Sequence, residues 1–246
     1  MKRTLLALLV LAFVVTGCSK NNNSVSGQTT EGTDPVVPGP LSTAGYGHST
    51  QPMTAPYWQL PPGVQLTDSI HEFSYCWAFP PYTQVPRKEW KGLPLGFTFC
   101  LTLRNTTVQP ITVIFPPELV FISVSSKHQN VLVIDLGTVQ LEGGSEKTIV
   151  AQASCLNKGR DVPEPYKEGT DAFLSYSFGP SQLPAPLQEI AGILKPKHIS
   201  MNDVLKADGS FDAGKVAKYA VIQQAIWEVT DENGLTEATR KKLKDL

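Results

Sequence analysis

The stretch LGFTFCLTLR, residues Leu95–Arg104, decides the fold class of this chain. Every second position from Leu95 to Leu103 is a large apolar residue, and small or polar residues lie between them. Strict alternation of this kind predicts a β-strand with one buried face. The Asn105-Thr106-Thr107 stretch then ends the strand with residues typical of turns.

Similar strand patterns lie on both sides of this stretch. One is predicted before it, at Ile70–Phe79, with aromatic side chains along one face. The strands predicted after it are Ile111–Phe115, Leu119–Val124, Val131–Leu136 and Lys147–Cys155. Short strands with frequent turn signals favour an immunoglobulin-like antiparallel β-sandwich, which we place at residues 63–180. The strand, Asn-Thr turn and strand over Leu101–Val113 also resemble the opening of many extracytoplasmic modules of this type.

The C-terminal part changes to a helical period. A short helix is predicted up to Leu194, and Asp212 is placed to cap a longer one over Ala213–Thr230. Thr236 is placed to cap a last, basic helix over Glu237–Leu246. The fold class expected is therefore mainly β with a helical C-terminus (α+β), in which residues 181–246 pack on the sandwich.

The N-terminus has the pattern of an export signal. Lys2 and Arg3 precede an apolar run, Leu5–Val15, which is too short to span a bilayer. The residues that follow, Val15-Thr16-Gly17-Cys18, resemble the lipobox of bacterial lipoproteins. The resemblance implies that residues 1–17 are a signal peptide, cut before Cys18, and that Cys18 carries the lipid. The alternatives are an ordinary secretory signal with a chance cysteine, or a transmembrane helix.

Residues 18–62 read as a tether after the lipidated cysteine. The segment is poor in large aliphatic residues and rich in Asn, Ser, Thr, Gly and Pro, so it buries too little apolar surface to order itself. The expected location is the cell envelope, with the membrane as partner through the lipid. In a Gram-negative cell, Ser19 is compatible with sorting to the outer membrane.

Composition argues against several classes of function. The net charge is −1 and the pI is about 6.4, and no cluster of Lys and Arg interleaves with aromatic residues, so nucleic-acid binding is not expected. The four histidines have no metal-ligand spacing, and no catalytic, phosphate-binding or dinucleotide-binding motif is present. We expect no enzyme activity, no metal and no cofactor.

The cysteines raise a separate question. If Cys18 carries lipid, Cys76, Cys100 and Cys155 remain, an odd number that implies an unpaired thiol or other chemistry. Cys76 and Cys100 both lie out of phase with the apolar faces of their predicted strands, so neighbouring strands would bring them together as a disulfide. The alternative is that all three are small buried apolar residues.

One motif carries chemistry of its own. The segment Ile222–Trp227 resembles the T-Q-x-A-I-W signature of thioester domains in bacterial surface adhesins, although Ile222 replaces the threonine. In that family a buried Gln condenses with a Cys, and the resemblance implies Gln223 with Cys76, or with Cys100 or Cys155. The alternative is that Gln223 packs the helix on the sheet, with its amide hydrogen-bonded to backbone.

Three functions follow as expectations. The first is a non-enzymatic, membrane-anchored lipoprotein that serves as a binding or adhesion module for a protein or glycan. The second is a covalent adhesin that uses a Cys–Gln thioester. The third is a structural lipoprotein in envelope assembly.

Overall fold

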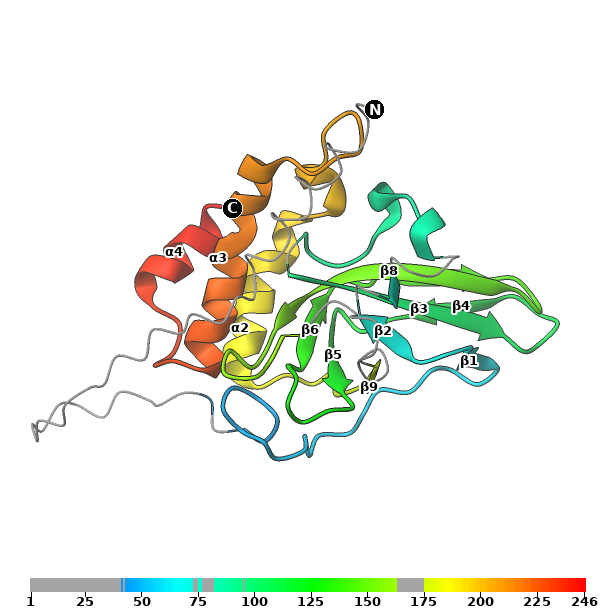
Figure 1. Cartoon of the computed structure of the whole chain (residues 1–246), viewed down its shortest axis with the longest axis horizontal. Helices are drawn as coiled ribbons and strands as arrows, with labels where there is room; N and C mark the ends of the chain where they lie inside the picture. The colour runs from blue at the N-terminus through cyan, green and yellow to red at the C-terminus, as the bar shows by residue number, and fades with distance from the viewer. Residues whose placement is uncertain (1–40, 42, 73–74, 77–81, 95, 163–174) are drawn as a thin grey trace, which may run out of the picture.

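A closed antiparallel β-barrel forms the centre of the protein. The computed structural model describes residues 41, 43–72, 75–76, 82–94, 96–162 and 175–246. Six strands close the ring in the order β3-β2-β9-β5-β6-β8, and β8 returns to β3 (Figure 1). Their bounds are β2 (Ile70–Glu72), β3 (Phe97–Asn105), β5 (Glu118–Ser123), β6 (Val131–Ile134), β8 (Glu146–Cys155) and β9 (Ser175–Phe178). A short further strand, β1 (Val64–Leu66), pairs with the end of β3.

The expected β-sandwich of immunoglobulin-like type is therefore wrong. The two longest strands pair with each other, with Phe97 opposite Ala153 and Arg104 opposite Glu146. A sandwich would leave the other edges of its two sheets open, whereas β2 and β9 join β3 to β5 and close the ring. The error has a physical reason: a strand with one face turned inward shows the same alternation in a barrel as in a sandwich.

The barrel interior is packed with aromatic and aliphatic side chains. The apolar face predicted for β3 points inward, and Phe99, Leu101 and Leu103 are fully buried there. The Phe99 ring meets Tyr176 of β9 edge-on, with 4.8 Å between ring centroids. Alternate residues of β3 face outward, and Cys100 among them is also fully buried, because other segments cover that side. The predicted phase of this strand is thus confirmed.

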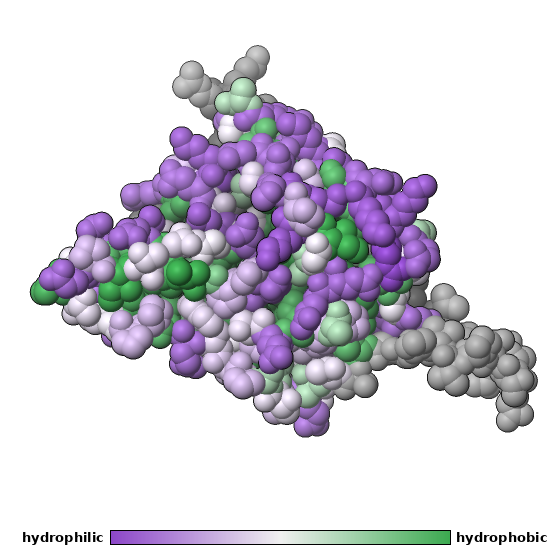
Figure 2. Space-filling view, turned by 180° about the vertical axis from the view of Figure 1, so that it is seen from behind, coloured by the Kyte–Doolittle hydropathy of each residue, from purple (hydrophilic) through white to green (hydrophobic). Residues whose placement is uncertain are grey.

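A second, two-stranded sheet continues one end of the barrel. It consists of β4 (Ile111–Ile114) and β7 (Thr138–Leu141), which pair from Ile111 opposite Leu141 to Ile114 opposite Thr138. Strand β7 was not predicted. This end of the molecule carries exposed apolar side chains, with Val108 at 87% and Ile114 at 71% exposure. Figure 2 shows apolar surface at the end of the molecule away from the helices.

Three α-helices cover one side of the barrel (Figure 1). They are α2 (Ala185–Leu194), α3 (Ala213–Thr230) and α4 (Glu237–Lys244), in agreement with the predicted helical C-terminus. Val120 of β5 and Leu132 of β6 face outward into the apolar layer that the helices share. Within the described residues, no helix has both the length and the apolar character needed to span a membrane.

The predicted N-cap residues fulfil their roles. The Asp212 carboxylate accepts hydrogen bonds from the N–H groups of Gly214 and Lys215, and so starts α3. The Thr236 hydroxyl accepts from the N–H of Thr239 and starts α4. Both caps satisfy N–H groups that have no partner inside the helix.

Residues 43–62 lie in the segment expected as a tether, and the structure places part of it against the folded body. Tyr46 and Met53 are buried in the layer between barrel and helices. The Asn157 side-chain amide donates to the carbonyls of Gly45 at 3.1 Å and Gly47 at 2.9 Å. These contacts fix a loop whose composition alone predicts no order.

The strand predicted at Ile70–Phe79 is shorter in the structure. It ends at Glu72, and the following Tyr75 and Cys76 lie in a helical turn. The remaining residues of that prediction, including Trp77 and Phe79, lie outside the described residues.

Candidate functional site

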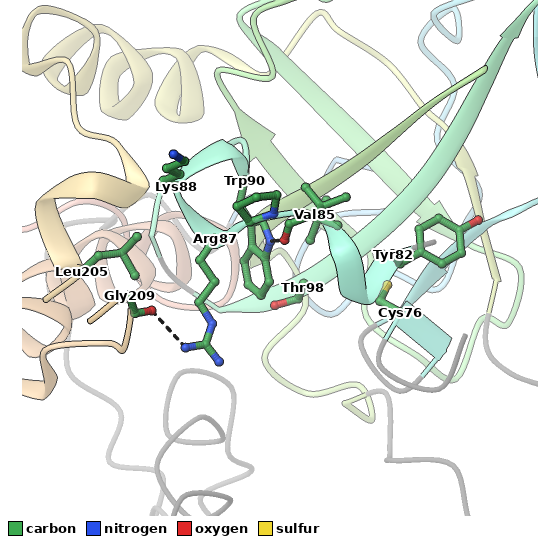
Figure 3. Close-up of a pocket in the computed structure, with 11 residues that line it drawn as sticks. Cys76, Tyr82, Val85, Arg87, Lys88, Trp90, Thr98, Leu205 and Gly209 are labelled. Carbon is green, nitrogen blue, oxygen red and sulfur yellow. Dashed lines mark hydrogen bonds between the residues drawn. The ribbon is translucent and has the colours of Figure 1, made fainter. Parts of the chain in front are cut away.

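A cavity of about 410 Å³ opens where the barrel meets the segment that leads into α3 (Figure 3). Its walls come from the connection between β2 and β3, from the outer faces of β3 and β8, and from a loop before α3. The lining residues are Cys76, Tyr82, Val85, Pro86, Arg87, Lys88, Trp90, Thr98, Val150, Leu205 and Gly209. Ligand sites in proteins commonly have volumes from about 300 Å³ upward and apolar walls with a few polar groups.

Two short 3-10 helices, η1 (Tyr82–Gln84) and η2 (Arg87–Glu89), form the wall of the cavity that comes from the connection between β2 and β3. Pro86 sits at the N-cap of η2 in an extended conformation, and the turn ends at Trp90. The Trp90 indole N–H donates to the Val85 carbonyl at 3.1 Å. That hydrogen bond fixes the ring, so the indole offers its apolar surface to the cavity and its polar atom is already used.

Arg87 joins the two sides of the cavity. Its Nη1 donates to the Gly209 carbonyl at 3.1 Å, and its guanidinium carbon lies 4.9 Å from the centre of the Phe211 ring. Figure 3 shows the side chain extended from η2 toward Gly209. Phe211 in turn meets the Trp90 ring at 6.2 Å between centroids. An aromatic face and a carbonyl therefore hold the guanidinium in place.

The charges among the described lining residues are positive. Arg87 and Lys88 carry them, and no aspartate or glutamate belongs to this described part of the lining. Among the described residues, no carboxylate is recorded within ion-pair distance of either side chain. Thr98 adds a hydroxyl that accepts from the Gln152 amide at 3.5 Å and keeps its own hydrogen to donate. The arrangement suits an anionic group.

A disulfide lies at the end of the cavity near Tyr82. The structure joins Cys76 and Cys100, the two residues that phase placed on one side of the sheet. The bond ties the turn after β2 to the outer face of β3, and Tyr82 packs beside both sulfurs. It therefore holds the start of the connection that forms the cavity wall.

A polar cluster stands behind this disulfide. The Tyr75 hydroxyl donates to the Asp68 carboxylate at 2.9 Å, and His71 Nε2 lies 2.9 Å from the same carboxylate. The His71 and Tyr75 rings stack at 3.6 Å. Desolvation raises the pKa of Asp68, but the hydrogen bonds from the Ser69 N–H, His71 and Tyr75 outweigh it and lower the pKa overall. This carboxylate therefore stays charged and braces the turn that carries Cys76.

Gln223 lies next to Cys155, one of the three cysteines proposed for a thioester. Its amide accepts from the Cys155 backbone N–H at 2.8 Å and donates to the Cys155 carbonyl at 3.0 Å. These bonds attach α3 to the end of β8, as in the alternative that assigns Gln223 a packing role. Cys76 and Cys100 are joined to each other. No cysteine of the described chain is a free thiol in the structure, so the unpaired thiol, one of the two outcomes that an odd number of cysteines implied, is not found there.

The other predicted sites give less information. Cys18, the lipidation residue, lies outside the described residues. Within the described part of the chain, no group of three His, Cys, Asp or Glu side chains is placed to hold a metal ion.

The cavity itself was missed by the sequence analysis. The length of the connection between β2 and β3 could have indicated it. Strand β2 ends at Glu72 and its antiparallel neighbour β3 begins at Phe97, and a hairpin loop of a few residues would be enough to connect them. The long connection carries the sequence VPRKEW, Val85–Trp90, in which Arg87, Lys88 and Glu89 lie between apolar residues and a tryptophan. Long connections in compact domains are commonly functional.

Comparison with family models, with curated proteins and with solved structures finds no match to this chain.

Proposed function

We propose that the protein is a lipid-anchored extracytoplasmic binding module, and that the cavity beside Arg87 and Trp90 is its ligand site. One observation carries the proposal: an apolar cavity of about 410 Å³ has two cations and no acidic residue among the lining residues that the structure describes. Burying surface beside unpaired positive charge has a cost unless a ligand supplies the counter-charge.

The surroundings suit binding by a preformed site. Arg87 is held by Gly209 and Phe211, Trp90 is held by Val85, and the disulfide holds the start of the connection. Side chains fixed before the ligand arrives lose less entropy on binding, so more of the contact energy appears as affinity. The lining provides an aromatic surface, two cations and a hydroxyl donor, which are groups that bind a ligand noncovalently.

Filling the cavity tests the assignment. The substitution Val85→Trp places a large ring among the lining residues, and Val124→Trp makes the same change at an exposed position on the barrel. A thermal-shift screen of small organic acids, sugars and peptides should give compounds that raise the melting temperature of the wild type and of Val124→Trp. The same compounds should lose that effect on Val85→Trp. Equal shifts in all three proteins would place binding elsewhere and refute the site.

The anchor is tested through Cys18. Metabolic labelling with a palmitate analogue should mark the wild-type chain, and Cys18→Ser should remove the label and release the protein from the membrane fraction. Labelling that survives Cys18→Ser would contradict a lipid on this residue.

The other two functions stay predictions. A Gln223 thioester would reduce the intact mass of the mature protein by one ammonia, and Gln223→Ala would abolish the deficit. A structural role in the envelope would give a stable complex with envelope proteins in a pull-down. Neither has contacts in its favour comparable to those of the cavity.

A further inference from the structure

The geometry points to a compact organic anion as the ligand, with an apolar or aromatic body and a single carboxylate, sulfonate or phosphate group. This inference rests on the proposed function, because it concerns the occupant of the same cavity. Three properties of the lining restrict the chemical class of the ligand: the position of the positive charge, the contacts that hold it, and the small number of other polar groups.

The position of Arg87 carries the anionic part of the inference. A guanidinium presents five N–H donors in a planar fork, and one of them is used on Gly209. Its contact with Phe211 uses none of these N–H donors in a hydrogen bond, so the others are left for a ligand. A carboxylate, sulfonate or phosphate matches two parallel N–H donors, which is the strong geometry for such pairs.

Lys88 and Thr98 are further polar residues of the lining, and Figure 3 shows the Lys88 amine pointing away from the Arg87 guanidinium. Lys88 is exposed and belongs to the same short helix as Arg87, so it adds a cation at the rim, which the exposed Glu89 of that helix partly offsets. Thr98 is buried on β3 and has a hydroxyl hydrogen to donate. One fixed arginine, a lysine at the rim and a hydroxyl donor provide enough positive charge and donors for a single anionic group of the ligand.

The rest of the lining argues against a sugar. A polyhydroxylated ligand needs several side chains that hydrogen-bond its hydroxyls, and the described lining residues include no acidic or amide side chain. Trp90 uses its N–H on Val85, which leaves the hydroxyls of Thr98 and Tyr82 as the neutral donors of the described lining; the Tyr82 hydroxyl also accepts from Thr102 at 3.4 Å. What remains is the apolar surface of Val85, Pro86, Trp90, Val150 and Leu205. An apolar or aromatic body gains by leaving water for such a surface.

A matched pair of fluorescent probes separates charge from apolar body. The compound 8-anilinonaphthalene-1-sulfonate carries a sulfonate, and N-phenyl-1-naphthylamine has the same rings without it. With the purified mature protein we expect the sulfonate to bind about tenfold more tightly than the neutral probe, the ratio for one charge-assisted pair. Raising the salt concentration should weaken the binding of the sulfonate probe and leave the binding of the neutral probe unchanged.

Variants then locate the charge. Arg87→Gln should lower the affinity for the sulfonate probe about tenfold and change the affinity for the neutral probe by no more than about twofold. Arg87→Lys keeps the charge but loses the planar fork, and should fall between the two. Lys242→Gln removes an exposed cation from α4, far from the lining residues, and should change neither affinity.

The outcomes distinguish this inference from the proposed function. If both probes bind equally, and Val85→Trp abolishes both, the cavity is a ligand site but the anionic inference is wrong. If Val85→Trp leaves both affinities unchanged, the probes bind elsewhere and the proposed site itself fails. If Arg87→Gln does not fold, the comparison of the two probes on wild-type protein still decides the charge preference.

Discussion

Single residues join the helices to each other and to the barrel, and Glu228 is the clearest case. Its carboxylate, on α3, accepts from the Thr239 hydroxyl at 2.6 Å and from the Thr236 N–H at 2.9 Å. Thr236 is itself the N-cap of α4, so a side chain from one helix completes the cap of the next. A negative charge at this end also suits the helix dipole of α4.

The pKa of Glu228 predicts how stability depends on pH. Desolvation raises this pKa, but the hydrogen bonds from Thr239, Thr236 and Gln224 outweigh it, so the pKa lies below its ordinary value of 4.5. A carboxylate with a lowered folded-state pKa stabilises the fold above the unfolded-state pKa, and this is lost as pH falls through the folded-state value. Urea unfolding should therefore show Glu228→Gln to be less stable by about 1–2 kcal/mol at pH 7.

The gap should begin to narrow as the pH falls below the unfolded-state pKa of about 4.5, and should close below the lowered folded-state pKa, where the wild type also carries a neutral side chain. Glu142→Gln, at an exposed position, serves as the control and should match the wild type at both pH values. A gap of the same size at pH 7 and at pH 3 would show that the charge of Glu228 has no part in it.

Gln223 gives a second prediction at this scale. Removing its amide in Gln223→Ala leaves a buried N–H and carbonyl of Cys155 without partners, which should cost about 2–4 kcal/mol. The neighbouring Gln224→Ala removes an exposed side chain whose one bond, at 3.3 Å, goes to Glu228, and should cost less than about 1 kcal/mol. Chemical denaturation measures the unfolding free energy of both variants. Equal decreases in the two would contradict the stabilising role assigned to the contact between Gln223 and Cys155.

Sequence predicts such residues when their partners are local. Asp212 and Thr236 cap helices that start at the next residue, so spacing alone identified them. Arg87 was missed because its partners, Gly209 and Phe211, lie more than a hundred positions away in the chain. No local pattern records a contact of that kind.

At the scale of elements, the length of a strand decided which ones were predicted. Strand β3 shows a full alternating pattern, and its inward and outward faces came out as expected. Strands β1 and β9, with three and four residues, had no prediction, since so few residues give little periodic signal, and β2 was predicted from Ile70 but too long. Because β9 joins β2 to β5 and so closes the ring, missing it turned a barrel into a sandwich.

The disulfide between Cys76 and Cys100 acts at this scale, since it ties the turn after β2 to β3. It closes a loop over a sequence separation of 24 residues, so the Cys76→Ala/Cys100→Ala protein should lose about 3 kcal/mol of unfolding free energy. The same variant should also bind the sulfonate probe less tightly, because the start of the cavity wall is released. Unchanged stability under oxidising and reducing conditions would show that the bond does not support the fold.

At the scale of the whole molecule, the barrel and the helices share one apolar layer. Leu187 of α2 and Ile222 of α3 are fully buried in it, together with Leu132 of β6. The cavity lies where this arrangement leaves a gap between η2, on the barrel side, and the loop before α3. Amphipathic patterns predicted that the helices would pack on the β part, but the gap depends on how the two surfaces meet, which composition and period do not record.

The central claim is that ligand binds at this junction, and amide mapping by nuclear magnetic resonance tests it most directly. The mature protein, labelled with ¹⁵N, is titrated with 8-anilinonaphthalene-1-sulfonate. We predict shifts concentrated at residues 82–90 and 205–211, with Thr98 and Val150 among them. Shifts concentrated instead at the exposed apolar end near Val108 and Ile114, with residues 82–90 unchanged, would contradict the account.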